Sequence, residues 1–453
     1  MAINVVLGIP ASGKSRFEKE YVARLVNKGY RVLWLTPLKS EAHTTAVEFV
    51  NRYGLEPTQV KILFSKLDYC ERLKRIQKIY KTYNTLIGLA ACLSCPVSSS
   101  VCPFKQAIRD AMRGSPGLYI ATHQFFWLSP MFYKVVVDES DYLIPDIYFQ
   151  MLSEQQINIT FKILRKMFSE DIVEKIKNKY IVKIDYPEGT KYMIRSRWIV
   201  KYFVDERIMS MVSATLPVDK EVFNWYFGCD NEFELEDTIG DKLYLVKMKP
   251  PQRQDKFYVL LAKNYFYSSI RYETYYYIPR IVERYLREDK TITIVCRSKK
   301  EVYTLYDRLK KSGIKKNYML AENINWFKKN VGDWMYYPVR LLVIGGKFYR
   351  SLNMDSDVTI GFYQHLSRDD KERLVQHYYY IVNDPYEIVD FIQYRKHIQT
   401  VFRSIRNWNK SHTVLLLDST YIDSIDYFKH ISEYVVPRMR RITINYLKNY
   451  EMF

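Results

Sequence analysis

The octapeptide GIPASGKS at residues 8–15 has the composition and spacing of a phosphate-binding loop. It fits the pattern G-x-x-x-x-G-K-[ST], between an apolar run typical of a strand and a charged segment with helical spacing. Gly8 and Gly13 allow backbone N–H groups to close around phosphate oxygens. Lys14 can neutralise the β- and γ-phosphates, and the Ser15 hydroxyl can ligate magnesium. The segment predicts a site for ATP and Mg²⁺.

The tetrapeptide DESD at residues 138–141 directly follows an apolar VVV run, so its carboxylates should emerge where a buried strand ends. An acidic pair after a strand is often only a turn or a helix cap. Beside a phosphate loop it has a further use, because one carboxylate can hold magnesium while the other orients or deprotonates an attacking water. We therefore predict that Asp138 holds the metal and that Glu139 acts as the base.

Four of the six cysteines lie between these two motifs: Cys70, Cys92, Cys95 and Cys102. The sequence has neither a signal-peptide pattern nor an apolar run of about 20 residues, so we expect an intracellular, cytoplasmic protein without a membrane segment. Thiols stay reduced in that compartment, which favours metal ligation over a disulfide framework. Cysteine thiolates bind zinc and iron–sulfur clusters alike, so the spacing alone leaves both metals open.

The segment QTVFRSIR at residues 399–406 places Gln399, Arg403 and Arg406 on one face of an expected helix. Two arginines so arranged can reach a γ-phosphate across a domain cleft and stabilise its charge during phosphoryl transfer. The alternative is a solvated basic stripe. The tripeptide SAT at residues 213–215 ends another apolar run and is compatible both with an interdomain contact and with a plain strand end.

The chain carries a formal net charge of +19 together with 41 tyrosines and 23 phenylalanines among its 453 residues. Basic surfaces attract phosphate backbones and aromatic faces stack on unpaired bases, which favours single-stranded nucleic acid as a partner. A basic surface over ordinary core aromatics is the alternative. Apolar residues make up 48% and charged residues 26%, so we expect a folded chain rather than a disordered one.

The elements that would position these residues are buried strands that alternate with helices. Apolar runs lie at residues 3–8, 31–37, 118–122, 134–141 and 207–215, and a second series lies at 291–296, 339–346, 358–362 and 413–418. Continuous β-branched runs between helices predict parallel sheets covered on both faces, with ligands at the carboxyl ends of the strands. We expect an α/β protein with two parallel-sheet domains.

The domain boundaries follow from this pattern. Residues 1–145 and 206–240 would form the first domain, and residues 241–453 the second. Residues 146–205, which are rich in lysine and isoleucine and have helical spacing, would form a largely helical module inserted into the first domain.

The order of phosphate loop, DExD, SAT and a late Q-x-x-x-R-x-x-R resembles that of superfamily 2 helicases, which have two RecA-like domains. Four cysteines between the first two motifs resemble those that hold an iron–sulfur cluster in the XPD and DinG branch. Further segments resemble motifs of that branch in the correct order: TPLKSEAHTTAVEF at residues 36–49, ATHQFFWL at 121–128 and GGKFYRSLNM at 345–354. The likeness spans nearly the whole chain.

This resemblance implies an ATP-dependent DNA helicase that moves 5′ to 3′ along single-stranded or forked DNA as a monomer. It also implies a 4Fe–4S cluster rather than zinc in a cysteine insertion at residues 66–113, an arch-like role for residues 146–205, and arginine fingers at Arg403 and Arg406. Two rivals remain. One is a DNA-dependent ATPase or translocase that does not unwind duplexes, and the other is a non-hydrolytic protein that binds single strands.

The chain departs from the pattern of that family at several positions. Asp141 stands where the family has a histidine, and Phe402 stands where it has a glycine. In the fifth motif Arg350, Ser351 and Asn353 replace an acidic residue, a glycine and an aspartate. The arch-like insertion is also short. The sequence therefore supports ATP hydrolysis better than strand separation.

Overall fold

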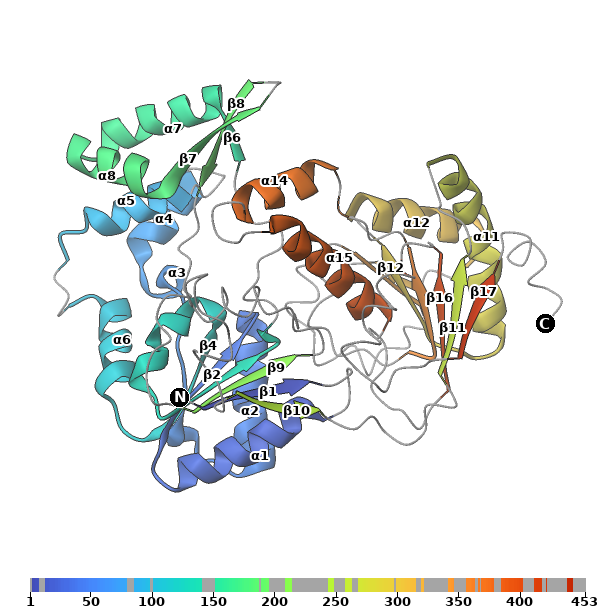
Figure 1. The fold of residues 1–453 in the computed structure, drawn as a ribbon, viewed down its shortest axis with the longest axis horizontal. Coiled ribbons are helices and arrows are strands. Elements are labelled where there is room, and N and C mark those ends of the chain that lie inside the picture. The colour runs from blue at the N-terminus through green and yellow to red at the C-terminus, as the bar shows by residue number, and fades with distance from the viewer. Residues whose placement is uncertain are drawn as a thin grey trace.

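Two parallel seven-stranded sheets form the framework of the chain, which we describe from a computed structural model (Figure 1). The described residues are 2–7, 13–79, 85–97, 101–140, 151–186, 189–194, 208–213, 243–247, 257–262, 268–296, 299–314, 319–321, 341–345, 356–362, 366, 368–378, 384–401, 411–417, 421 and 438–442. Among them, no helix combines the length and apolar character needed to cross a bilayer.

The first sheet has the strand order β10-β1-β9-β5-β2-β4-β3, and all its neighbouring strands are parallel. Its strands are β1 (Ala2–Leu7), β2 (Arg31–Thr36), β3 (Val60–Ile62), β4 (Gly117–Thr122), β5 (Lys134–Asp138), β9 (Ile208–Ser213) and β10 (Leu243–Lys247). Helices α1 (Lys14–Asn27) and α2 (Lys39–Tyr53) pack on one face, where Val22 and Phe49 share a core with Trp34. Because β10 pairs with β1, this sheet extends past residue 240, the boundary expected from the sequence.

The second sheet is also parallel throughout and has the order β13-β14-β12-β15-β16-β11-β17. Its strands are β11 (Phe257–Ala262), β12 (Ile292–Cys296), β13 (Met319–Ala321), β14 (Leu341–Gly345), β15 (Val358–Gly361), β16 (His412–Leu416) and β17 (Arg438–Ile442). Its helices are α11 (Ser268–Arg287), α12 (Lys299–Lys311), α14 (Arg368–Tyr378) and α15 (Pro385–Val401). In Figure 1, α15 lies on the side of this sheet nearer the first sheet, and α11 and α12 lie on the other side. The predicted α/β class with two parallel sheets is confirmed.

The four cysteines of the predicted insertion lie in the segment between β3 and β4. Its elements are α3 (Lys66–Tyr69), α4 (Glu71–Ile79), α5 (Thr85–Leu93) and α6 (Pro103–Arg113). The 3₁₀ helix η1 (Pro57–Gln59) precedes β3, and a second, η2 (His123–Met131), follows β4. Cys102 is the N-cap residue of α6, and Pro103 occupies the first helical position, where a missing N–H costs nothing.

A second insertion contains β6 (Met151–Ser153), α7 (Glu154–Met167), α8 (Glu170–Tyr180), β7 (Ile181–Tyr186) and β8 (Gly189–Ile194). Its strands form an antiparallel sheet in the order β6-β8-β7, so the expectation of a largely helical module is wrong for its second half. From residue 182 to residue 186 the sequence VKIDY alternates apolar and polar, which suits a half-buried strand. We call these residues, 151–194, the α7–α8 module.

The two insertions share one hydrophobic core, although β4 and β5 separate them in the chain. In this core Leu86 and Ala90 of α5 pack together with Leu164 of α7 and Ile176 of α8, and all four are 0% exposed. The side chains of Cys70 and Cys92 pack against the same cluster. The stability of the cysteine insertion therefore depends on the α7–α8 module.

Truncation of this shared core should loosen both insertions. Ile176→Ala removes most of a fully buried side chain, so we expect a loss of about 2–5 kcal/mol in local stability. Amide hydrogen exchange should then become faster in α5 as well as in α8, whereas Lys175→Ala, at an exposed neighbouring position, should leave both unchanged. Faster exchange in α8 alone would show that the two insertions are independent.

Candidate active site

The carboxyl ends of three strands meet at one edge of the first sheet. Strand β9 lies between β1 and β5 and is parallel to both. Its register places Ser213 opposite Leu7, the last residue of β1. It also places Val212 opposite Asp138, the last residue of β5. The ends of β1 and β5, which precede the phosphate-loop and DESD segments in the sequence, therefore lie at the same edge of the sheet, on either side of β9.

Helix α1 begins at Lys14, directly after a glycine that makes the turn. Gly13 is the N-cap residue, with φ 89° and ψ 10°, a left-handed conformation that side chains other than glycine strain to adopt. The first N–H groups of a helix lack intrahelical partners and carry its partial positive charge. Lys14 adds a full charge at that end and is only 9% exposed. The start of α1 is therefore suited to an anion such as a phosphate.

One hydrogen bond joins the two motifs. Ser15 Oγ donates to Asp138 Oδ1 at 2.9 Å. Burial raises the pKa of the Asp138 carboxyl. The charge of Lys19, the Ser15 hydroxyl and the charge of Lys14 act against that rise. A hydroxyl and a carboxylate oxygen this close are the donor type that Mg²⁺ takes, and the ion would also offset the cost of burying the carboxylate. These two side chains therefore fit the predicted magnesium ligands.

Glu139 has an unusual backbone conformation. Its φ of 50° lies in the left-handed region, which costs a residue other than glycine about 1–3 kcal/mol unless the surrounding structure holds it there. The next residue supplies such a constraint, because the buried Ser140 Oγ donates to the carbonyl oxygen of Val212 at 3.4 Å. The turn directs the chain after β5 away from the strand direction and sets the position of the Glu139 side chain beside Asp138.

His123 lies beneath this turn and was not assigned a role from the sequence. Its Nε2 lies 2.8 Å from the carbonyl oxygen of Asp138, and its ring also hydrogen-bonds to the backbone of Leu35. Burial lowers the pKa of His123 to about 4. The ring is therefore neutral at physiological pH, and it connects the ends of β2 and β5 from the start of η2.

Buried charges fix α1 against the strands. Lys134 of β5, which is 0% exposed, forms an ion pair with Glu18 of α1 at 3.1 Å. Its Nζ also donates to Ser210 Oγ of β9 at 2.5 Å. Burial lowers the pKa of Lys134, and the charge of Glu18 opposes that shift. A buried charge is tolerated only when it is paired, so the pair constrains the helix that carries Lys14 and Ser15.

The four cysteines are gathered near one another, each half buried. Burial raises the pKa of the Cys92 thiol, the charge of Lys66 lowers it, and the thiols of Cys70, Cys95 and Cys102 raise it further. In the part of the chain that the structure describes, however, no three His, Cys, Asp or Glu side chains are arranged so that they could hold a metal ion. The residue types thus suit a metal centre, whereas their arrangement does not provide its ligand geometry.

A row of aromatic rings runs along the same edge of the sheet. Neighbouring centroids are 5.5 to 6.3 Å apart along the series His43, Phe64, Tyr69, Phe104 and Phe125. Lys39 lies over Phe64 and Lys66 lies over Phe104, at 5.3 and 5.6 Å from the ring centroids. We call these five rings the aromatic row. No spacing in the sequence indicates it, because its members come from α2, α3, α6, η2 and the residues after β3.

The structure brings Lys14, Ser15, Asp138 and Glu139 together. It places Gln399 half buried in the last turn of α15. Several predicted residues lie outside the described residues, namely Gly8, Arg403 and Arg406, together with Asp141, Arg350, Ser351, Asn353 and Phe402.

The two parallel sheets, each with helices packed against it, are RecA-like domains in fold. No family model matches the chain, and no curated protein does either. The chain is similar in fold to Xpd4 of S. tokodaii, with 12% identity and a TM-score of 0.54 over 97% of this chain and 96% of that one.

Two other solved structures are less similar. A DEAD box protein of Methanococcus jannaschii has 13% identity and a TM-score of 0.42, over 98% of this chain and 88% of that one. The Mycobacterium smegmatis helicase Lhr, bound to ssDNA and AMP-PNP, has 13% identity and a TM-score of 0.46, over 95% of this chain and 46% of that one. At these identities the likenesses concern the fold.

The buried histidine predicts a pH dependence of stability. The folded chain holds His123 neutral down to about pH 4, whereas the unfolded chain takes up a proton near pH 6.5, so stability falls as pH drops through this interval. We expect the first sheet to lose about 2 kcal/mol between pH 7 and pH 5 from this group. Amide exchange of β2 and β5 across a urea series at the two pH values measures the loss.

His123→Gln is the matched variant, because glutamine keeps hydrogen-bonding capacity but does not titrate in this range. Between pH 7 and pH 5 this variant should lose about 2 kcal/mol less stability than the native chain. Equal losses in the two proteins would show that His123 is not the group responsible.

Proposed function

We propose that this chain is an ATP-dependent motor that acts on nucleic acid and, more narrowly, a superfamily 2 DNA helicase similar to those of the XPD and DinG branch. The observation that carries the proposal is the hydrogen bond from Ser15 Oγ to Asp138 Oδ1, beside the buried Lys14, at the carboxyl edge of a parallel sheet. The order of the sequence motifs and the fold likeness to Xpd4 support it.

The site residues divide the work of ATP hydrolysis. The start of α1 and Lys14 bind the phosphates, and Ser15 and Asp138 hold Mg²⁺, which when bound neutralises charge on the phosphate oxygens. A water oxygen attacks the γ-phosphorus while the bond from that phosphorus to the β–γ bridging oxygen breaks. ADP and inorganic phosphate are the products. Glu139 orients the water and accepts its proton.

The second sheet would complete the site. We propose that Gln399 contacts the nucleotide and that Arg403 and Arg406 stabilise charge on the γ-phosphate from across the interdomain cleft. The two domains would close on ATP and open after hydrolysis, and each cycle would advance the protein along single-stranded DNA, 5′ to 3′, as a monomer inside the cell. The resemblance in the motifs supports these assignments.

The aromatic row and its lysines support a nucleic-acid partner. Half-buried rings such as Phe64 and Tyr69 can stack on bases, while Lys39 and Lys66 neutralise phosphates. Members of the row follow β2, β3 and β4 in the chain, so the row lies at the carboxyl ends of strands of the same sheet as the candidate site. The net charge of +19 favours such binding.

We further propose that Cys70, Cys92, Cys95 and Cys102 hold a 4Fe–4S cluster. The closeness of the four thiols supports the proposal, and the irregular spacing argues against a zinc ribbon. Ligand geometry would have to form when the metal binds, as is common for metal sites. The hydrolysis described above does not depend on this centre.

Loss of the phosphate lysine or of the base should abolish hydrolysis. We expect Lys14→Ala and Glu139→Gln each to lower DNA-stimulated ATPase turnover by roughly 100-fold or more, because each removes a group that stabilises charge or moves the proton in the transition state. Phosphate release with and without single-stranded DNA measures this. Lys28→Ala, at an exposed position just beyond α1, is the control and should keep full turnover.

The rivals give different results in the same experiment. If both site variants keep full turnover, the proposed site is wrong. A native chain that releases no phosphate with DNA is a non-hydrolytic binding protein. A forked duplex, assayed in parallel, separates a helicase from a translocase that hydrolyses ATP but leaves the strands paired.

The metal content tests the cysteine centre directly. Protein purified without oxygen should contain iron and absorb broadly near about 400 nm, and replacing Cys92 with serine should remove both signals because a thiolate ligand is lost. Cys296→Ser, in a buried strand of the second sheet, is the matched control and should keep them. Colourless protein that contains zinc would overturn the iron–sulfur assignment, and protein without metal would overturn the centre.

A further inference from the structure

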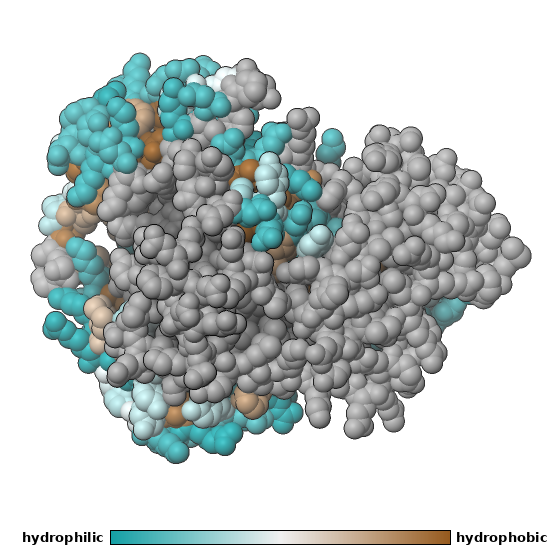
Figure 2. Space-filling model, viewed as in Figure 1, coloured by the Kyte–Doolittle hydropathy of each residue, from teal (hydrophilic) through white to brown (hydrophobic). Residues whose placement is uncertain are grey.

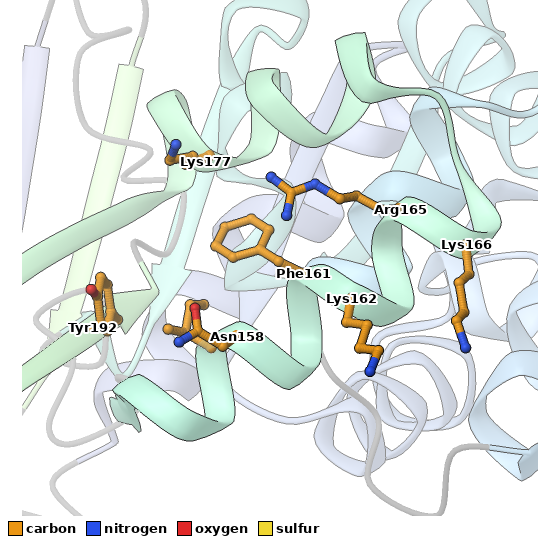
Figure 3. Close-up of a pocket in the computed structure, with 8 residues that line it drawn as sticks. Asn158, Phe161, Lys162, Arg165, Lys166, Lys177 and Tyr192 are labelled. Carbon is orange, nitrogen blue, oxygen red and sulfur yellow. The ribbon is translucent and has the colours of Figure 1, made fainter.

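A groove of about 600 Å³ opens on the surface of the α7–α8 module, away from the residues assigned above (Figure 3). Helix α7 supplies most of its lining, α8 supplies one residue and β8 another. The lining residues are Ile157, Asn158, Phe161, Lys162, Arg165, Lys166, Lys177 and Tyr192. Figure 2 shows that hydrophilic residues dominate the described surface of this part of the molecule, with smaller apolar areas between them.

The lining of this groove contains four cations, and none of the described residues that line it is acidic. Lys162 and Lys166 are exposed and lie one turn apart on α7. Arg165 and Lys177 are held by Glu170 and Glu174 at 3.0 and 3.6 Å, and all four side chains of these two pairs are about half exposed. Exposed pairs of this kind contribute little, so a phosphate can replace the carboxylate as partner. The groove is therefore an electropositive site.

Two aromatic rings accompany these charges. Figure 3 shows the ring of Phe161 between the side chains of Arg165 and Asn158, with Tyr192 and Lys177 across from them. Phe161 and Tyr192 are only partly buried against the shared core. Aromatic faces beside cations bind single strands, because the rings stack on bases while the cations neutralise the backbone. The Asn158 amide adds a donor and an acceptor for base edges.

We propose that this groove binds single-stranded nucleic acid, as a contact additional to the strand bound along the sheets. An acidic peptide would satisfy the four cations but would leave the two rings and the amide without a role. The role of this groove rests on the proposed function, since a strand held there would extend beyond the motor. The test of binding is independent of that function, because binding is measured without ATP.

The experiment measures binding of oligo-dT to the full chain by fluorescence anisotropy. Strands of about 10 and about 40 nucleotides are compared, because only the longer one can reach both the groove and the contact along the sheets. We expect Lys162→Glu and Lys166→Glu each to weaken binding of the longer strand, and the double variant to weaken it roughly tenfold or more at low salt. The slope of log K against log salt should become shallower by roughly 1.4 in the double variant, about 0.7 for each lost phosphate contact. The short strand should bind as before.

Lys175→Glu is the matched control, because it makes the same charge change at an exposed position of α8 that does not line the groove. Equal affinity of Lys162→Glu, Lys166→Glu and Lys175→Glu for the longer strand would overturn the proposal. So would displacement of that strand by poly-glutamate as readily as by unlabelled oligo-dT, which would indicate a site for acidic peptides. ATPase stimulated by the short strand should be unchanged in the double variant, so failure of the groove and failure of the motor are distinguishable.

Discussion

Parallel pairing of β9 with both β1 and β5 is the constraint on which the candidate active site depends. Parallel strands end at the same edge of a sheet, so the carboxyl ends of β1 and β5 lie on either side of that of β9, although about 130 residues separate them in the chain. The register matters as much as the direction, because a slip by one residue would move Asp138 away from Ser15 and invert the faces of β5. Everything proposed about hydrolysis follows from that alignment.

Burial of charge strengthens the same alignment. The ion pair between Lys134 and Glu18 lies inside the sheet-to-helix packing, where an uncompensated charge would cost several kcal/mol. Such a pair adds little net stability, but it penalises any displacement of α1 along β5. The neutral ring of His123 acts on the other side of the site, because it holds the carbonyl of Asp138 in place. The helix that carries Lys14 and Ser15 and the strand end that carries Asp138 are thus each held by a buried polar contact.

The sequence predicted those strands whose signal lies within a few consecutive residues, and it missed those without such a signal. Runs such as RVLWLT and KVVVD are continuous and β-branched, so β2 and β5 were predictable with the motifs that follow them. Strand β17, RMRRI, has no apolar run, and β3 and β13 have three residues each, so periodicity gives no signal for them.

Other features depend on distant residues that meet only in the fold. The aromatic row, the ion pair within the first sheet and the core common to both insertions join segments that no local pattern connects. The common core also sets an order of events during synthesis. Helix α8 leaves the ribosome roughly 80 residues after α5, a delay of about 4 to 16 s at typical elongation rates. Through that interval α5 lacks the packing that α8 gives it, so the core against which Cys70 and Cys92 pack is incomplete until the second insertion has been made.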